Sequence, residues 1–142
     1  MVSPDGRWLA YTSNESGRNE IYVRPFPAVN EGKWLVSIEG GVEARWAPNG
    51  RELFFMSGGG PVPRFLWGAP ILDSKVFKAG TPTVIAKPSS GTAGAYDLAP
   101  DGRFLFHVPS SSVASAGELP HLVLVQNWFE ELKSRMRATS TQ

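Results

Sequence analysis

The hydrophobic positions of the chain gather into short runs that are apolar at consecutive positions. One such run returns three times, at residues 9–12, 53–56 and 105–108. Neighbouring residues of a β-strand point to opposite sides of its sheet, so these runs predict strands with two apolar faces. A sheet wetted on one face would alternate apolar with polar residues. We therefore expect small sheets that stack face to face and cover one another.

A tight turn precedes each run. The turns share a proline, an aspartate or asparagine, a glycine and then an arginine; they contain Pro4, Asp5 and Gly6, then Pro48, Asn49 and Gly50, then Pro100, Asp101 and Gly102. Proline presets φ, Asp and Asn tolerate the left-handed region, and glycine takes positive φ without steric cost. With a short strand before each turn, the pattern predicts three β-hairpins. We assign the Asp and Asn residues to hydrogen bonding within these structural turns rather than to calcium binding, because they fall in different copies.

Equivalent turn positions lie 44 and then 52 residues apart, a period typical of a repeat architecture. Each copy continues into a third strand, at 20–24, 65–69 and 122–125, and the first two copies show a fourth, at 34–38 and 83–86. Four short antiparallel strands in about 45 residues form the unit of a β-propeller. The predicted fold class is all-β: a partial β-propeller of about three four-stranded antiparallel blades with a short C-terminal helix.

The repeats resemble the TolB-like, WD-repeat-like β-propeller family over about residues 1–133. Units of that family open with Trp/Phe-Ser-Pro-Asp-Gly and continue into an Ile/Leu-Ala-Tyr strand and then an Ile-Tyr-Val strand, which residues 9–11 and 21–23 match. Asn49, in place of aspartate, departs from this pattern, as does the Gly/Pro-rich segment 58–63. The resemblance implies one partial propeller domain over 1–142, with blades at 1–41, 42–94 and 95–126.

The period of the pattern changes after the last strand. Asn127 is a favourable helix N-cap with Glu130 three places on, and apolar residues follow at helical spacing, so we expect a short amphipathic helix at 127–137. Residues 127–133 are similar to the closing stretch of propeller segments at the C-terminus of bacterial serine/threonine kinases. This second resemblance implies a bacterial, kinase-associated module with a kinase domain and further blades upstream of Met1. Met1 falls inside a repeat, which also predicts a truncated N-terminus.

Composition excludes several classes of protein. The net charge is +1 and the acidic and basic residues are interspersed, so no electrostatic footprint for nucleic acid is present. No apolar run of about 18 residues occurs, and we expect no membrane insertion. The absence of cysteine excludes disulfides and thiolate metal sites. The first residues do not resemble a signal peptide, and the compartment stays open.

Catalytic motifs are missing from the sequence. It contains no Gly-x-Ser-x-Gly nucleophile elbow and no kinase motif. His107 is expected at a packed or edge position of a strand and His121 on a solvated flank. Neither histidine has a neighbour suited to orient a catalytic base or to complete a zinc site. We therefore expect no enzyme activity, no catalytic residue, no metal and no cofactor.

Charged residues on the expected inner strands form the candidate ligand site. Arg45 aligns with Asp97 between copies, and Glu43 lies two residues before Arg45, on the same face of a regular strand. Because inner strands of a propeller line its central channel, these three residues are predicted to contact a small polar ligand there. The alternative is a structural ion pair or a solvated rim.

Together these features predict a non-catalytic module for protein–protein interaction or ligand sensing, as a C-terminal fragment of a longer bacterial propeller protein. Three blades do not close a ring, so the exposed sheet face and strand edges are expected to bind a protein partner or the remaining blades of a parent propeller. A homo-oligomer in which two chains supply six blades would satisfy the same surfaces. Two alternatives stay open: an accessory propeller piece of a peptidase or glycoside-acting enzyme, and a truncated reading frame with no independent role.

Overall fold

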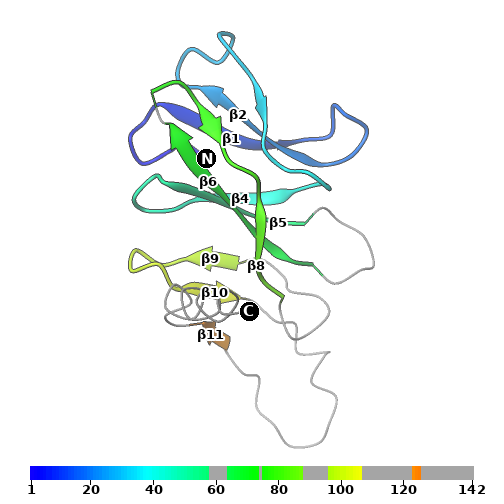
Figure 1. Cartoon of the computed structure of the whole chain (residues 1–142), viewed down its shortest axis with the longest axis vertical. Helices are drawn as coiled ribbons and strands as arrows, with labels where there is room; N and C mark the ends of the chain where they lie inside the picture. The colour runs from blue at the N-terminus through cyan, green and yellow to red at the C-terminus, as the bar shows by residue number, and fades with distance from the viewer. Residues whose placement is uncertain (58–63, 74, 88–95, 107–122, 126–142) are drawn as a thin grey trace, which may run out of the picture.

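The computed structural model describes residues 1–57, 64–73, 75–87, 96–106 and 123–125, and within these ranges every element is a β-strand. The strands form three separate sheets. Figure 1 shows the sheets following one another along the long axis of the molecule, in the order of the chain. For the described ranges, the prediction of an all-β chain is confirmed.

The first sheet contains β1 (Trp8–Ser13), β2 (Glu20–Pro25) and β3 (Trp34–Leu35), with β2 in the middle. A single bridge between Val2 and Leu9 adds a short piece of inner strand. β2 ends at Pro25, whose nitrogen carries no hydrogen to donate, and Pro27 follows two residues later. Prolines at these positions prevent the strand from continuing as a paired central strand.

The second sheet contains β4 (Val42–Trp46), β5 (Glu52–Met56), β6 (Leu66–Asp73), β7 (Lys78–Ala79) and β8 (Thr83–Ala86). It has five strands rather than the predicted four, because β6 is long enough to pair with β8 near its start and with β7 near its end. The third sheet contains β9 (Tyr96–Leu98), β10 (Phe104–Phe106) and β11 (Val123–Val125), with β10 in the middle.

Two apolar clusters join the sheets. The first lies between the first and second sheets and includes Trp8, Ile21, Trp46, Leu53 and Phe55. The second lies between the second and third sheets and includes Phe54, Met56, Leu66, Tyr96, Phe104 and Phe106. β5 sends alternate residues into both clusters, which explains why its apolar run contains no polar position. Full burial of one such side chain contributes roughly 1.5–3 kcal/mol.

The third hairpin differs in register from the first two. The bridge from Val2 to Leu9 in the first copy matches the pair Trp46–Leu53 in the second. Repeat alignment predicts Leu98 opposite Leu105 in the third copy, yet Leu98 lies opposite Phe104. The turn is correspondingly tighter, since the N–H of Ala99 bonds to the carbonyl of Arg103 at 2.8 Å, one residue earlier than in the other copies.

A slip of one residue exchanges the two faces of a strand. Phe104 and Phe106 consequently face the second sheet, where they are 1% and 4% exposed, while Leu105 is 39% exposed. Its aligned counterpart Leu53 is fully buried. Two phenylalanines bury more apolar area than the leucine would, and this gain favours the slipped register.

One face of the first sheet points away from the second sheet and has no sheet against it among the described residues. It carries Leu9, Tyr11, Tyr22, Arg24 and Leu35, which lie opposite one another on neighbouring strands. Along each strand these residues alternate with residues that pack in the first cluster, so they point to the other side of the sheet. The rings of Tyr11 and Tyr22 stack with centroids 5.9 Å apart, and Arg24 Nε donates to the Tyr11 hydroxyl at 2.8 Å. We call these five residues the outer face.

Several predictions fall outside the described residues. These are the helix at 127–137, His107 and His121. In the ranges that the structure describes, no helix is long and apolar enough to cross a membrane.

Candidate functional site

The three turns are built alike, and the side chain of the Asp or Asn closes each of them. The Oδ1 atoms of Asp5, Asn49 and Asp101 accept hydrogen bonds from the backbone N–H two residues on, at 3.2, 2.9 and 3.1 Å. The glycines that follow take φ of 73°, 67° and 85°, which favours residues without a Cβ atom. The Asp and Asn side chains thus form the hydrogen bonds within the turns that the sequence predicted.

The turns differ in charge. Asp5 forms an ion pair with Arg7 at 2.8 Å, and Asp101 forms one with Arg103 at 2.7 Å. A hydrogen bond from the Ser3 hydroxyl, followed by the contacts of Arg7, holds the pKa of Asp5 below its ordinary value. Asn49 is neutral and offers Arg51 no such pair. Within the described ranges no ion pair joins Arg51 to a carboxylate.

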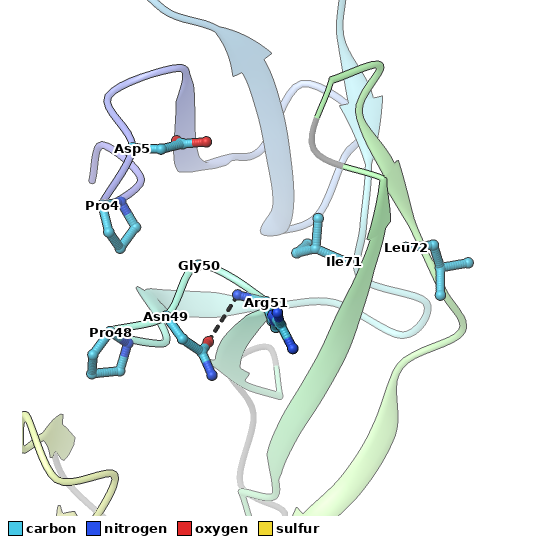
Figure 2. Close-up of a pocket in the computed structure, with 8 residues that line it drawn as sticks. All are labelled: Pro4, Asp5, Pro48, Asn49, Gly50, Arg51, Ile71 and Leu72. Atoms are coloured by element: carbon cyan, nitrogen blue, oxygen red, sulfur yellow. Dashed lines mark hydrogen bonds between the residues drawn. The ribbon is translucent and has the colours of Figure 1, made fainter.

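A groove of about 660 Å³ lies between the first two turns. Its walls are residues 4–5 of the first turn, residues 48–51 of the second, and Ile71 and Leu72 of β6. Figure 2 shows Pro4 and Asp5 facing the second turn across this space, with β6 along one side. The wall is mixed in character, because the Arg51 guanidinium, the Asn49 amide and the Asp5 carboxylate stand beside two prolines and Ile71.

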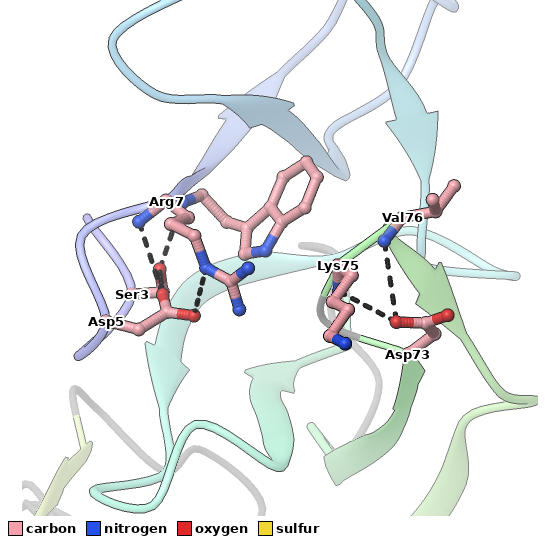
Figure 3. Close-up of polar contacts among 7 residues, drawn as sticks. Ser3, Asp5, Arg7, Asp73, Lys75 and Val76 are labelled. Carbon is pink, nitrogen blue, oxygen red and sulfur yellow. Dashed lines mark hydrogen bonds and ion pairs between the residues drawn. The ribbon is translucent and has the colours of Figure 1, made fainter.

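A group of polar contacts lies at the end of β6, directly after Leu72 in the sequence (Figure 3). Asp73 Oδ1 accepts hydrogen bonds from the backbone N–H groups of Lys75 at 2.7 Å and Val76 at 3.4 Å. The Lys75 hydrogen bond is the largest cause of a lowered pKa of Asp73, and the charges of Lys75 and Arg7 act in the same direction. The electrostatic influence of Arg7 therefore extends from the first turn to the end of β6.

The predicted channel residues separate into two pairs. Arg45 Nε lies 3.7 Å from Asp97 Oδ1, which connects the inner strands β4 and β9. Glu43 Oε1 instead pairs with Nη2 of Arg64 at 3.0 Å. The structure thus brings Arg45 and Asp97 together, as their alignment between copies suggested, while Glu43 is held by a residue that the sequence did not single out.

The expected placement of Glu43 on a regular strand was wrong. The β4–β5 register shifts between Val42 and Arg45, and Glu43 has a positive φ of 58°, unusual for a residue with a Cβ atom. Val42 packs against the second cluster although Ala44, two residues on, belongs to the first. A bulge therefore interrupts the alternation, and counting by two from Arg45 does not predict the direction of Glu43.

Tyr96 lies next to Arg45, and the sequence analysis did not predict a role for it. The Arg45 guanidinium stands over its ring, with Cζ 5.8 Å from the centroid. Within the described ranges the Tyr96 hydroxyl and Glu43 Oε2 are buried without a hydrogen-bond partner. Burial is the main cause that raises the pKa of Tyr96. In the sequence, its position directly before Asp97 was the one available signal.

The chemistry open to these residues is hydrogen bonding and charge pairing. Glu43 and Asp97 each pair with a different arginine. In the described part of the chain, no group of three His, Asp or Glu side chains is arranged to hold a metal ion.

Comparison with known proteins bears on the fold. No family model and no curated protein matches the chain. Among solved structures, it is similar to the crystal structure of TolB from Acinetobacter baumannii, with a TM-score of 0.60 at 20% identity. The fold is a partial TolB-like β-propeller.

The similarity covers 87% of this chain and 28% of the TolB chain, so the chain spans less than a third of TolB's length. At this level of identity the likeness concerns the fold alone. The predicted partial all-β propeller is confirmed for the described residues, and in a TolB-like propeller the stacked sheets are blades. The resemblance to kinase-linked segments stays a prediction, because it concerns residues and domains that this similarity does not address.

Proposed function

We propose that this chain is a non-catalytic, protein-binding module of TolB-like propeller type. We further propose that it binds a second propeller sheet through its outer face, and that a second copy of the chain supplies that sheet. The observation that carries the proposal is an equivalence between copies. Leu9 and Tyr11 of the outer face align with Leu53 and Phe55, which the second sheet buries against the first.

The same strand positions therefore have different surroundings in the two sheets. Leu53 and Phe55 are 0% and 1% exposed, whereas their counterparts Leu9 and Tyr11 are half-buried. Leu35, on the neighbouring strand of the outer face, is 56% exposed. Lys33 lies over the ring of Tyr22 at 5.1 Å, and Arg24 over that of Tyr11 at 6.0 Å. Side chains of this length can swing away when an apolar surface docks. A sheet face that carries apolar and aromatic residues and has no sheet against it in the described ranges suits an interaction surface.

The pairing of each predicted channel carboxylate with an arginine supports a non-catalytic role. A piece of a glycoside-acting enzyme would need two carboxylates that converge on one bond. Glu43 and Asp97 are instead each held by their own arginine. An accessory role in such an enzyme remains the second hypothesis, and no described contact favours it.

Analytical ultracentrifugation of the full chain over a wide concentration range tests the proposal. We expect a reversible dimer that the Leu35→Asp substitution abolishes, because a carboxylate would then be buried in the interface. Val76→Asp is the matched control: Val76 is 71% exposed and lies away from the outer face, so the dimer should persist. A wild-type chain that sediments as a monomer at every concentration, or a dimer insensitive to Leu35→Asp, would contradict the proposal.

A further inference from the structure

The second turn is the exception among three similar turns. Arg7 and Arg103 are each neutralised by the aspartate two residues before them, at 2.8 and 2.7 Å. At the same place in the second turn, Asn49 accepts the backbone hydrogen bond of Arg51 at 2.9 Å and brings no charge. Asparagine in place of aspartate therefore preserves the backbone hydrogen bond of the turn. It leaves the Arg51 guanidinium without an ion pair to a carboxylate among the described residues.

This guanidinium belongs to the wall of the groove between the first two turns. The cavity of about 660 Å³ is large enough for a few amino-acid side chains. Its apolar wall includes the exposed Pro4 and Pro48 and the half-buried Ile71, whose side chain Figure 2 shows turned toward the groove. An exposed arginine beside exposed aliphatic surface offers one charged and one apolar contact to the same ligand.

The charges around the groove favour an anion. Asp5 is paired with Arg7, and Asp73 lies beside Lys75 at the end of β6. Each of these two acidic residues thus has a basic neighbour, whereas Arg51 forms no ion pair with a carboxylate in the described ranges. A local positive potential raises the concentration of anionic ligands near the surface.

We propose that this groove binds an acidic peptide, with Arg51 receiving the carboxylate of an Asp or Glu side chain and with Pro4, Pro48 and Ile71 receiving an adjacent apolar side chain. The planar guanidinium matches a carboxylate in two parallel hydrogen bonds. A single unpaired cation suits one carboxylate, and the apolar wall gives the ligand a contact that a free inorganic anion cannot use. The proposal goes beyond the outer face and concerns a different surface and a different partner.

Titration of the 15N-labelled full chain with an acetylated and amidated Leu-Glu-Leu peptide tests this assignment. We expect shifts at the backbone amides of residues 49–51 and at the Arg51 Nε–H. The Leu-Gln-Leu peptide should bind at least tenfold more weakly, because it cannot form the charged pair. Inorganic phosphate, titrated in parallel, should bind no more tightly than the Glu peptide.

The decisive variant is Asn49→Asp. It rebuilds the Asp–Arg pair of the other two turns, so the turn should fold normally while its own carboxylate competes for Arg51. We expect at least a tenfold loss of affinity for the Glu peptide, and a similar loss for Arg51→Gln. Arg103→Gln removes the equivalent arginine from the third turn and should leave binding unchanged.

Three results would overturn the proposal: wild-type affinity in the Asn49→Asp chain, equal binding of the Glu and Gln peptides, or phosphate binding that exceeds peptide binding. The last result would indicate a simple anion site. The Leu35→Asp chain should keep its peptide affinity, so failure at this groove and failure at the outer face are separate outcomes.

Discussion

Phe54 and Phe104 meet edge to face across the second and third sheets, with ring centroids 4.9 Å apart and planes at 89°. This geometry is one of the favoured arrangements of two aromatic rings. The contact exists because the third hairpin is slipped by one residue, since in the register of the other copies Leu105 would take the place of Phe104 against the second sheet.

Alanine substitutions on β10 can test this register. Phe104→Ala should lower the free energy of unfolding by about 3–5 kcal/mol, because it leaves a cavity in the second cluster. Leu105→Ala should cost less than about 1 kcal/mol, since the side chain is 39% exposed. Urea unfolding curves measure both. A larger loss for Leu105 than for Phe104 would mean that the hairpin keeps the register of the first two copies.

Glu20 is a buried carboxylate that organises the end of the first sheet. It is 2% exposed, accepts hydrogen bonds from the Ser37 hydroxyl and from the Gly40 N–H, and pairs with Arg18. Glu20→Ala leaves these donors without an acceptor and should cost about 3 kcal/mol. The exposed pair of Glu15 with Lys33 is the control, and Glu15→Ala should cost less than about 1 kcal/mol in the same denaturation experiment. Equal costs would show that the buried network contributes nothing beyond a surface pair.

Glu52 should make stability depend on pH. Burial raises its pKa above the ordinary value of 4.5, so the folded chain ionises this carboxyl less readily than the unfolded chain does. At low pH Glu52 is protonated in both the folded and the unfolded chain, so its ionisation does not change the free energy of unfolding. As the pH rises through 4.5 and then through the raised native pKa, the group becomes destabilising and stays so at neutral pH.

Glu52→Gln should therefore raise the urea midpoint at pH 7 and leave it unchanged at a pH of about 3. The comparison is made on the same preparation at the two pH values. A stabilisation of equal size at both would assign the effect to packing rather than to ionisation.

Tyr96 should tolerate loss of its hydroxyl. That oxygen is buried and has no hydrogen-bond partner in the described residues, so Tyr96→Phe should leave the free energy of unfolding unchanged or raise it by about 1 kcal/mol. Tyr11→Phe offers a contrast, since its hydroxyl accepts a hydrogen bond from Arg24 at 2.8 Å and its loss should cost about 1 kcal/mol. Marked destabilisation by Tyr96→Phe would show that the hydroxyl has a partner in solution.

The pair of Arg45 and Asp97 should matter little for folding. Asp97 is 75% exposed on its side chain and lies 3.7 Å from Arg45, so Asp97→Ala should change the free energy of unfolding by less than about 1 kcal/mol. If a ligand of the predicted channel site is found, Arg45→Ala and Asp97→Ala should weaken it. Unchanged affinity in both variants would remove that site from consideration.

Local chemistry was enough to predict the three hairpins. A Pro-Asp-Gly or Pro-Asn-Gly turn is built from hydrogen bonds within a few residues and from the positive φ of one glycine, so the presence of a turn does not depend on distant parts of the chain. The apolar runs that follow likewise predicted strands with two buried faces, and β5 has both faces covered by other sheets. These local patterns were therefore sufficient to predict the fold class and the repeat.

Packing between sheets decided the rest. The second sheet decides which side of β10 is buried, because Phe104 and Phe106 bury more apolar area against it than Leu105 would. A local sequence pattern does not contain the areas that the two registers bury. The bulge at Glu43, its pairing with Arg64 and the groove beside Arg51 arise where segments distant in sequence meet. The presence of a turn is set by neighbours along the chain, whereas register, side-chain partners and cavities are set by neighbours in space, which a local sequence pattern does not contain.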